Sequence, residues 1–274
     1  MDAATKKRRD LAAPAPIESR VEFTSGALEA AAQDSARCIS LSLDVEKLFR
    51  DARVISLTDS GASWLYYVPK WYRRIYTHCQ SHQEHVHLPY AEWFQRVWEL
   101  HPKFHHTIKM FGKDVPTPRF QQTFGADYRF SGTTFEAKPF PDEMRFVVQL
   151  LKACVVNPQT NESYLHSALV NWFAHGDHYI GPHADDESAL HHNAPIFAVS
   201  LGATRRFVIT PRANTGVENA KKLELLLGDG DLVVMGGTTQ KTHKHAVPKM
   251  KKSPGKRISI TMRCFKTTPI DNHA

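Results

Sequence analysis

His183-Ala184-Asp185 is the key motif of residues 171–263, the part of the chain around which the rest is organised. On an extended strand, side chains two positions apart point to the same face, so this imidazole and this carboxylate should lie side by side. A second histidine from a distant part of the chain would complete the two-histidine, one-carboxylate set that binds non-haem iron. The chain has 16 His and contains a second His-x-Asp, at His175 and Asp177, so the neighbouring sequence has to decide the interpretation.

Short apolar runs on both sides of this tripeptide predict strands. They cover residues 165–173, 195–201, 206–210, 223–227 and 231–235. Turn signals separate them, at Gly181-Pro182, Gly228-Asp229-Gly230 and Gly236-Gly237. Many short strands without an internal repeat are typical of a sandwich or barrel such as the jelly roll. His245 follows the last of these runs and is the candidate for the distant histidine.

The last predicted strand, residues 256–265, alternates between polar and apolar side chains. One face carries Arg257, Ser259, Thr261 and Arg263, and the other carries Ile258, Ile260 and Met262. Two arginines on an inward polar face need anionic partners, because a buried charge without a partner is costly. A dicarboxylate co-substrate would supply such partners.

The net charge and the cysteine content of the chain favour an intracellular protein with an anionic partner. The net charge is +7 and the isoelectric point is about 9.2, which favours a partner such as nucleic acid. The four cysteines form no C-x-x-C pair, which indicates reduced thiols rather than a disulfide framework. No apolar run reaches transmembrane length and no signal-peptide pattern opens the chain, so we expect a soluble protein that does not contact a membrane.

The first 106 residues divide into two parts by composition. Residues 1–35 are rich in Ala, Pro, Ser and charge, and we expect them to form a disordered basic tail. Its run Lys6-Lys7-Arg8-Arg9 fits a nuclear address, a nucleic-acid-binding arm or a merely solvated charge cluster. Residues 36–106 are expected to be a mostly helical extension of unknown role, with residues 90–98 forming one buried stripe.

This extension also contains several potential zinc ligands. They are Cys79, His82, His85, His87, His105 and His106. Their spacings match no standard zinc finger, so solvated side chains are the simpler interpretation.

Residues 107–140 are expected to form short extended segments. Met110-Phe111-Gly112 fits a hairpin tip, where the two large side chains would either pack on the core or act as a wedge between bases. Tyr128 and Phe130 share a strand face and would either pack across strands or sandwich a flat ring. Residues 141–156 predict one helix, with a single apolar stripe that should cover one face of the sheet.

Residues 107–265 resemble the AlkB family of iron(II)- and 2-oxoglutarate-dependent dioxygenases, and they look most similar to the animal-type members that repair alkylated duplex DNA. The matching segments are residues 110–113, 118–119, 128–132, 171–173, 180–187, 199–203, 245–248 and 257–263. The most specific features are the twelve-residue spacing from His245 to Arg257 and the R-x5-R pattern that ends at Arg263. The resemblance implies a mainly β domain over residues 107–268, with flanking helices around a double-stranded β-helix, or jelly-roll, core.

The resemblance also implies the ligands of the cofactors, which are Fe(II), 2-oxoglutarate and O2. His183, Asp185 and His245 would hold the iron, and His243 is a nearby rival that lacks the twelve-residue spacing. The residues that would contact 2-oxoglutarate are Asn171, Phe173, Arg257, Thr261 and Arg263. The family usually has a tyrosine at the position of Phe173, and loss of its hydrogen bond, worth about 0.5–1.5 kcal/mol, predicts weaker binding of 2-oxoglutarate.

The implied activity is oxidative demethylation of 1-methyladenine and 3-methylcytosine in DNA, with the base flipped into the site and formaldehyde, succinate and CO2 released. The residues implied to contact this substrate are Met110, Phe111, Gly112, Arg119, Tyr128, Phe130, Asp186, Glu187, Lys251 and Lys252. Asp186 and Glu187 would favour cationic alkylated bases, or would form a simple exposed acidic turn. The lysines would contact phosphates.

Three alternatives remain open at this point. The same chemistry would also suit RNA or another alkylated substrate, although a wedge favours duplex DNA. A non-catalytic nucleic-acid-binding protein would keep the basic surface and fail to bind iron and 2-oxoglutarate. A protein or small-molecule hydroxylase on the same fold would make the basic loop a coincidence. We expect a monomer in the nucleus, with alkylated duplex DNA as its partner.

Overall fold

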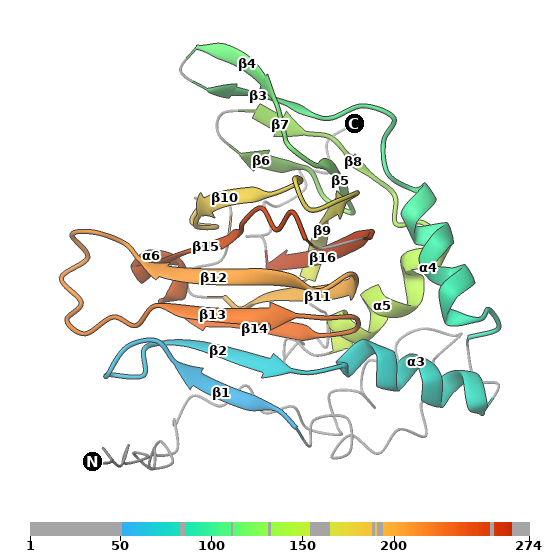
Figure 1. The fold of residues 1–274 in the computed structure, drawn as a ribbon, viewed down its shortest axis with the longest axis horizontal. Coiled ribbons are helices and arrows are strands. Elements are labelled where there is room, and N and C mark those ends of the chain that lie inside the picture. The colour runs from blue at the N-terminus through green and yellow to red at the C-terminus, as the bar shows by residue number, and fades with distance from the viewer. Residues whose placement is uncertain are drawn as a thin grey trace, which may run out of the picture.

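The computed structural model describes residues 51–82, 86–110, 112–130, 133–153, 165–187, 190, 194–252 and 255–264. Within these ranges the side chains of Met110, Ala153 and residues 128–130 and 133–135 are not described. The predicted basic tail at residues 1–35 therefore lies outside the described residues. The chain forms two packed sheets with helices along one side (Figure 1).

The larger sheet has eight strands in the order β1-β2-β14-β11-β16-β9-β5-β8. Their bounds are β1 Arg53–Ser56, β2 Ser63–Val68, β14 Leu232–Gly237, β11 Ile196–Gly202, β16 Arg257–Cys264, β9 Leu165–Phe173, β5 Phe120–Phe124 and β8 Ala137–Lys138. Neighbouring strands are antiparallel except β5 and β8, which are parallel. The predicted strands at 195–201 and 231–235 correspond to β11 and β14.

The smaller sheet has the order β10-β15-β12-β13. Its strands are β10 Ile180–His183, β15 His243–Val247, β12 Arg205–Pro211 and β13 Leu223–Leu227. Phe207 and Ile209 of β12 share one buried cluster with Phe173, Val233 and Met235 of the larger sheet. The two sheets therefore face each other across an apolar core, which confirms the predicted mainly β jelly-roll architecture.

Three helices cover the outer face of the larger sheet: α3 (Trp71–Ser81), α4 (Tyr90–Glu99) and α5 (Asp142–Ala153) (Figure 1). Aromatic side chains of α3 and α4 pack together, and the rings of Tyr72 and Trp93 lie 5.0 Å apart between centroids. Trp172 of β9 donates through Nε1 to the carbonyl oxygen of Val97 at 3.0 Å, which ties α4 to the sheet. The predicted stripe in residues 90–98 is confirmed. The helix predicted over residues 141–156 is confirmed as α5 over its described part.

The expectation that residues 36–106 are mostly helical is wrong for residues 53–68, which form β1 and β2. Ser63-Trp-Leu-Tyr-Tyr-Val is rich in aromatic residues, which favour a pleated, half-buried strand. β2 pairs with β14 from Val68 opposite Leu232 to Ser63 opposite Gly237. A long-range partner therefore decides the conformation, and this segment belongs to the same sheet as β11 and β16.

Two hairpins and a short helix complete the described chain. β3 (Thr107–Met110) and β4 (Lys113–Pro116) form a hairpin at one end of the molecule, and β6 (Tyr128–Phe130) pairs with β7 (Thr133–Phe135) nearby (Figure 1). Gly112 has φ +76° at the first tip, a conformation that suits glycine, so the predicted hairpin is confirmed. The short helix α6 spans Thr239–Thr242. No helix in the described ranges is long and apolar enough to cross a membrane.

Candidate metal centre and co-substrate cavity

The two histidines of the predicted iron site face each other across two strands of the smaller sheet. His183 ends β10 and lies directly opposite His245 of the antiparallel strand β15. Residues opposite each other in an antiparallel pair have their Cβ atoms close together, and here the ring centroids are 4.2 Å apart. Asp185 follows β10 by two residues. Ligand atoms of His183, Asp185 and His245 all lie within 4.8 Å of one another, as a metal ion requires.

The carboxylate of Asp185 is held from one side only. Arg263 donates to Oδ2 from Nε at 3.1 Å and from Nη2 at 2.9 Å. The backbone N–H of Asp185 donates to Oε1 of Gln240 at 3.0 Å. The other carboxylate oxygen, Oδ1, is buried without a hydrogen-bond partner among the described residues and lies 3.7 Å from Nε2 of His183. One oxygen therefore fixes the side chain, and the other is available as a metal ligand.

The protonation states at this centre suit a metal ion. Burial would raise the pKa of Asp185, but Arg263 and the two imidazoles outweigh it and bring the pKa down to about 2. Burial and the neighbouring His183 lower the pKa of His245 to about 3. Burial also lowers the pKa of His183, whose Nδ1 lies 3.0 Å from the carbonyl oxygen of Gly181. An ionised carboxylate and two neutral imidazoles are the forms that bind metal.

A cavity of about 500 Å³ opens between the two sheets beside this centre. Its lining includes all five residues predicted to contact 2-oxoglutarate, together with Ser259 and both histidines of the centre. The five are Asn171, Phe173, Arg257, Thr261 and Arg263. Four of the lining side chains come from alternate positions of β16, as the polar face of that strand predicts. The cavity therefore connects the metal centre to the polar side chains that are predicted to bind 2-oxoglutarate.

Arg257 lies in this wall, and some of its hydrogen-bond donors are unused. It is 2% exposed, and its Nη2 donates to Oγ of Ser200 at 2.9 Å. Its Nε and Nη1 have no hydrogen-bond partner in the described part of the chain. Burial and the nearby Arg205 lower the pKa of Arg257 to about 9. A buried guanidinium with two unused donors fits a carboxylate of a bound co-substrate.

Two predicted site residues have environments that the motifs did not indicate. Phe173 is 1% exposed, and its ring centroid lies 5.0 Å from Cζ of Arg257 and 5.4 Å from Cζ of Arg205. Arg119, predicted to contact substrate, is 8% exposed, and its Nε donates to Oδ1 of Asn171 at 2.6 Å. Arg119 therefore lies against the co-substrate side of the site.

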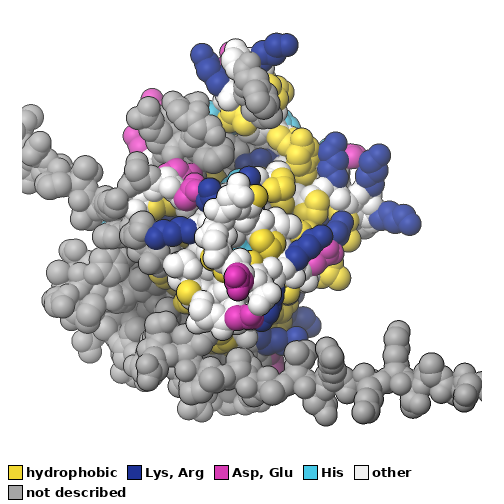
Figure 2. Space-filling view, turned by 90° about the vertical axis from the view of Figure 1, so that its left-hand side faces the viewer, with side chains coloured by type: hydrophobic (Ala, Val, Ile, Leu, Met, Phe, Trp, Pro, Cys, Tyr) yellow, Lys and Arg dark blue, Asp and Glu magenta, His cyan; other side chains and the backbone are white. Residues whose placement is uncertain are grey.

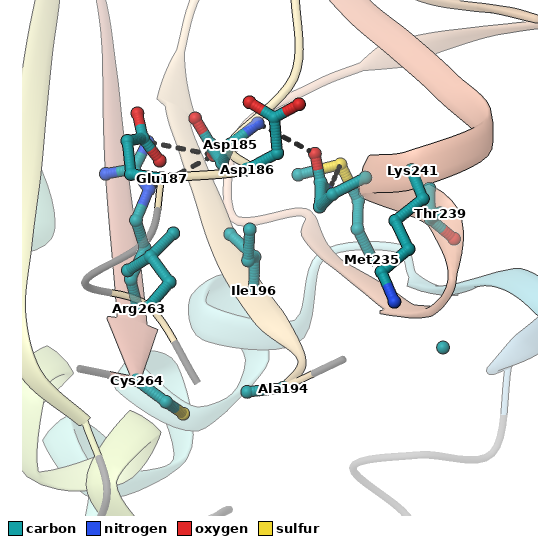
Figure 3. A pocket seen from close by; sticks show the side chains of 13 residues that line it. Asp185, Asp186, Glu187, Ala194, Ile196, Met235, Thr239, Lys241, Arg263 and Cys264 are labelled. Carbon is teal, nitrogen blue, oxygen red and sulfur yellow. Dashed lines mark hydrogen bonds and ion pairs between the residues drawn. The ribbon is translucent and has the colours of Figure 1, made fainter. Parts of the chain in front are cut away.

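A second cavity, of about 580 Å³, lies behind Asp185 and shares Met235 and Arg263 with the first. Figure 3 shows Asp185, Asp186 and Glu187 together at one side of it. Asp186 accepts a hydrogen bond from Nη1 of Arg212 at 2.6 Å, and its side chain is 49% exposed. The charge of Asp186 is therefore partly balanced within the protein.

The remaining predicted substrate residues lie at the molecular surface or outside the described residues. Gly112, Lys251 and Lys252 are exposed. Phe111 and the side chains of Met110, Tyr128 and Phe130 lie outside the described residues, although the backbone of the last three belongs to β3 and β6. Lys and Arg side chains gather over the β3–β4 hairpin and along one edge of the same face (Figure 2).

The structure leaves one rival candidate out of the metal-ligand group and adds two candidates that we did not predict. His243, the rival histidine, is buried with its Nδ1 2.7 Å from Oγ1 of Thr242, and it is not part of the metal-ligand group. Gln240 and Arg205 became candidates only through the structure. A buried Arg205 is signalled by strand alternation, because Arg206 beside it is paired with Glu224 on the outer face. Gln240 carries no such local signal.

Comparisons with known proteins agree with this geometry. The sequence is 33% identical over 162 residues to DNA oxidative demethylase ALKBH2 of Bos taurus, which covers 57% of this chain and 56% of the relative. The corresponding values for ALKBH2 of Mus musculus are 32%, 57% and 65%. Alpha-ketoglutarate-dependent dioxygenase alkB homolog 3 of Rattus norvegicus is 29% identical over 159 residues, covering 56% of this chain and 52% of the relative.

The chain thus spans less than two thirds of the length of these relatives. The solved structure of OsALKBH1 superposes with a TM-score of 0.44 at 18% identity, covering 73% of this chain and 97% of that structure. The family model of the 2OG-Fe(II) oxygenase superfamily matches residues 74–263, which include the metal-ligand group and the co-substrate cavity. The chain belongs to the 2OG-Fe(II) oxygenase superfamily, whose cofactors are Fe(II), 2-oxoglutarate and O2.

Proposed function

We propose that this protein is an oxidative demethylase of alkylated DNA that depends on Fe(II) and 2-oxoglutarate. The observation that carries the proposal is the group of His183, Asp185 and His245, the last two buried, at the edge of a cavity that Arg257 also lines. His183 and His245 bind the iron as neutral imidazoles, and Asp185 binds it through Oδ1. When bound, iron and 2-oxoglutarate supply the oxidation of a C–H bond by O2.

The residues of the cavity bind and orient 2-oxoglutarate. The unused Nε and Nη1 of Arg257 bind its remote carboxylate, and Asn171 and Thr261 donate further hydrogen bonds. Arg263 holds Asp185 in the orientation that directs Oδ1 to the metal. Phe173 and Phe207 provide an apolar wall that keeps water away from the reacting atoms.

The similarity to ALKBH2 and alkB homolog 3 supports alkylated nucleic acid as the substrate class. Exposed lysines are suited to phosphate contacts, with Lys109 and Lys113 on the β3–β4 hairpin and Lys251 and Lys252 after β15. We propose that Met110 and Phe111 at the hairpin tip fill the gap left by a flipped base. Tyr128 and Phe130 then stack on that base, with Asp186 and Glu187 nearby for its positive charge. A nuclear location and a monomeric state remain predictions.

Demethylation assays on matched oligonucleotides test this function. The substrates are a duplex DNA with one 1-methyladenine, the same single strand, and an RNA of the same sequence, each incubated with Fe(II), ascorbate and 2-oxoglutarate. We expect formaldehyde release and loss of one methyl by mass spectrometry, fastest on the duplex. The variants His183→Ala and Asp185→Asn should lose turnover, because the first removes a metal ligand and the second removes the negative charge of another.

A matched control comes from the second His-x-Asp of the chain. Asp177→Asn alters the exposed aspartate of that motif, where the side chain is 56% exposed, and should keep full turnover. Turnover that survives in Asp185→Asn would contradict the metal site. Absence of turnover on all three substrates, with iron and 2-oxoglutarate still bound, would refute DNA demethylation and leave the oxygenase site standing. Preference for the RNA would replace DNA by RNA as the substrate.

A further inference from the structure

Arg205 is a buried cation that the proposed function leaves without a role. It begins β12 and is 2% exposed, whereas its neighbour Arg206 pairs with Glu224 at the surface. The alternation of side chains along a strand explains the difference, because it turns Arg205 towards the interior. None of the ion pairs found among the described residues involves Arg205 or Arg257. Two guanidinium groups are therefore buried without ion-pair contact to any carboxylate in the described part of the chain.

The donors of Arg205 bind backbone carbonyl groups from the turn after β9 and from the segment after β15. Nη2 donates to the carbonyl oxygen of His178 at 2.7 Å and to that of Pro248 at 2.9 Å. Nη1 donates to the carbonyl oxygen of His175 at 3.3 Å. These contacts join the turn after β9 to the segment after β15, and β15 carries His245. Arg205 thus links the strand that carries Phe173 to the strand that carries a metal ligand.

The charge of Arg205 acts on the co-substrate cavity through Phe173. The guanidinium carbon atoms of Arg205 and Arg257 lie 5.4 Å and 5.0 Å from the centroid of the same buried ring. Arg205 is, after burial, the largest influence that lowers the pKa of Arg257. Both guanidinium groups make cation–π contacts with this ring, which attracts them but carries no formal negative charge. This end of the cavity therefore has an excess of positive charge.

One carboxylate, Asp231, acts against this excess of positive charge. Asp231 favours the charged form of Arg257, but its oxygens accept hydrogen bonds from Tyr67, Lys70 and Gly228. A ligand with a carboxylate at this end of the cavity would balance the excess. A ligand of the same shape without that carboxylate would add no negative charge here and would leave Nε and Nη1 of Arg257 without a hydrogen-bond partner.

We propose that Arg205 is a positioning residue of the co-substrate cavity, whose charge acts with that of Arg257 across the Phe173 ring to select a dicarboxylate over a monocarboxylate 2-oxo acid. This inference rests on the proposed function, because it assumes that 2-oxoglutarate occupies the cavity. Its carbonyl contacts have a second role, since they fix the turn after β9 against the segment after β15. The two roles can be separated by substitution, because lysine keeps the charge and glutamine keeps a donor without the charge.

Calorimetric titration of the full-length, Mn(II)-loaded protein tests the charge effect. The two ligands are 2-oxoglutarate and its 5-methyl ester, which lacks the remote charge. We expect Arg205→Gln to weaken 2-oxoglutarate about tenfold, or about 1.4 kcal/mol, and to change ester binding less than about twofold. Arg205→Lys should keep most of the preference for 2-oxoglutarate while lowering the melting temperature, because it loses the fork of carbonyl contacts. Arg206→Gln is the matched control and should bind both ligands as the wild type does.

Three outcomes would overturn the inference. Equal weakening of both ligands by Arg205→Gln would make Arg205 a purely structural residue. An unchanged preference in Arg205→Gln, with a wild type that binds 2-oxoglutarate and demethylates DNA, would refute this inference and leave the proposed function standing. If Arg205→Gln does not fold, Arg205→Lys decides, and loss of the preference in that variant contradicts a role for the charge. A wild-type protein that does not bind 2-oxoglutarate would refute the proposed function and the inference together.

Discussion

Arg263 donates two hydrogen bonds to one oxygen of Asp185, at 3.1 Å and 2.9 Å, and leaves the other oxygen facing His183. Both side chains are buried, with 5% and 1% exposed. A buried carboxylate in such a clamp keeps its charge at neutral pH and has only one direction in which to bind a metal. The clamp therefore connects the last strand, β16, to the metal centre.

Removal of this clamp should weaken metal binding without removing a metal ligand. We expect Arg263→Gln to lower iron affinity about 10–100-fold, because residues that orient a ligand have effects of this size. The variant should also be destabilised by about 3–5 kcal/mol, since it leaves a buried charge without its partner. Metal titration and urea unfolding measure the two effects. Equal iron affinity in Arg263→Gln and the wild type would contradict the role of the clamp.

Binding of 2-oxoglutarate should stabilise the folded protein through Arg257. With Mn(II) present and 2-oxoglutarate at about 100 times its Kd, linkage adds about 2.7 kcal/mol. For a protein of this size that energy corresponds to roughly 5–10 °C in the melting temperature. Differential scanning fluorimetry measures the shift. The variant Arg257→Gln should show a much smaller shift, and Lys256→Gln, an exposed neighbour, should show the full one.

The sequence was sufficient for the parts of the fold that local pattern determines. β11, β13 and β14 coincide closely with apolar runs, and the alternation in β16 places four polar side chains in the cavity wall. The metal ligands followed from His183-Ala184-Asp185 and from the spacing of His245 to Arg257. In each case the signal lies within the segment itself or within a motif of fixed spacing.

Long-range partners decided what the sequence did not predict. β2 has helix-like apolar spacing when it is taken together with the residues that follow it, and only its pairing with β14 makes it a strand. The contacts of Arg119 with Asn171 and of Gln240 with Asp185 join residues more than 50 positions apart. No periodicity in one segment encodes such contacts. The second His-x-Asp shows the same limit, because the turn that contains it is positioned by Arg205 and Met250.

The turn at Gly176 should determine the position of the basic segment after β15. A Cβ added to Gly176 would lie 2.1 Å from the carbonyl oxygen of Met250 and 2.9 Å from Cα of Lys251. The backbone N–H of Met250 donates to the carbonyl oxygen of Gly176 at 2.8 Å, so Gly176→Ala must displace this segment. We expect the slope of log K for DNA binding against log salt to decrease by roughly 1–2, as one or two lysine–phosphate contacts are lost.

Fluorescence anisotropy at several salt concentrations measures that slope. Asp177→Ala, which changes the exposed next residue, is the control and should bind DNA with the wild-type slope. A wild-type slope in Gly176→Ala as well would show that Lys251 and Lys252 do not contact phosphates.

Cys264 should make the free energy of unfolding depend on alkaline pH. Burial raises the pKa of its thiol from 9.0 to about 12. Between pH 9 and 12 the folded protein keeps a proton that the unfolded chain releases. The contribution of the thiol to the free energy of unfolding is therefore complete below pH 9 and is lost as the pH rises towards 12. Tyr67 and Tyr76, whose pKa values burial raises to about 12, act in the same direction.

Urea unfolding between pH 8 and 11 tests the contribution of the thiol. Relative to the wild type, Cys264→Ala should lose less stability between pH 9 and 11, because its unfolding releases up to one proton fewer per molecule. A residual alkaline loss should remain because of the tyrosines. An identical pH dependence in both proteins would mean that the thiol titrates normally in the folded state.

Phe173→Tyr should restore a hydrogen bond that the family usually has. A hydroxyl that donates to 2-oxoglutarate would contribute about 0.5–1.5 kcal/mol, which corresponds to roughly a two- to twelve-fold lower Kd. The same hydroxyl could instead accept a hydrogen bond from the unused donors of Arg257, whose guanidinium lies 5.0 Å from the ring centroid.

Calorimetry with 2-oxoglutarate and the melting temperature of the ligand-free protein distinguish these two hydrogen bonds. Tighter binding at an unchanged melting temperature supports the bond to the co-substrate, whereas a higher melting temperature with unchanged binding means that Arg257 takes the hydroxyl. Weaker binding would contradict both and would mean that the packing of Phe173 between two guanidinium groups has no room for an oxygen.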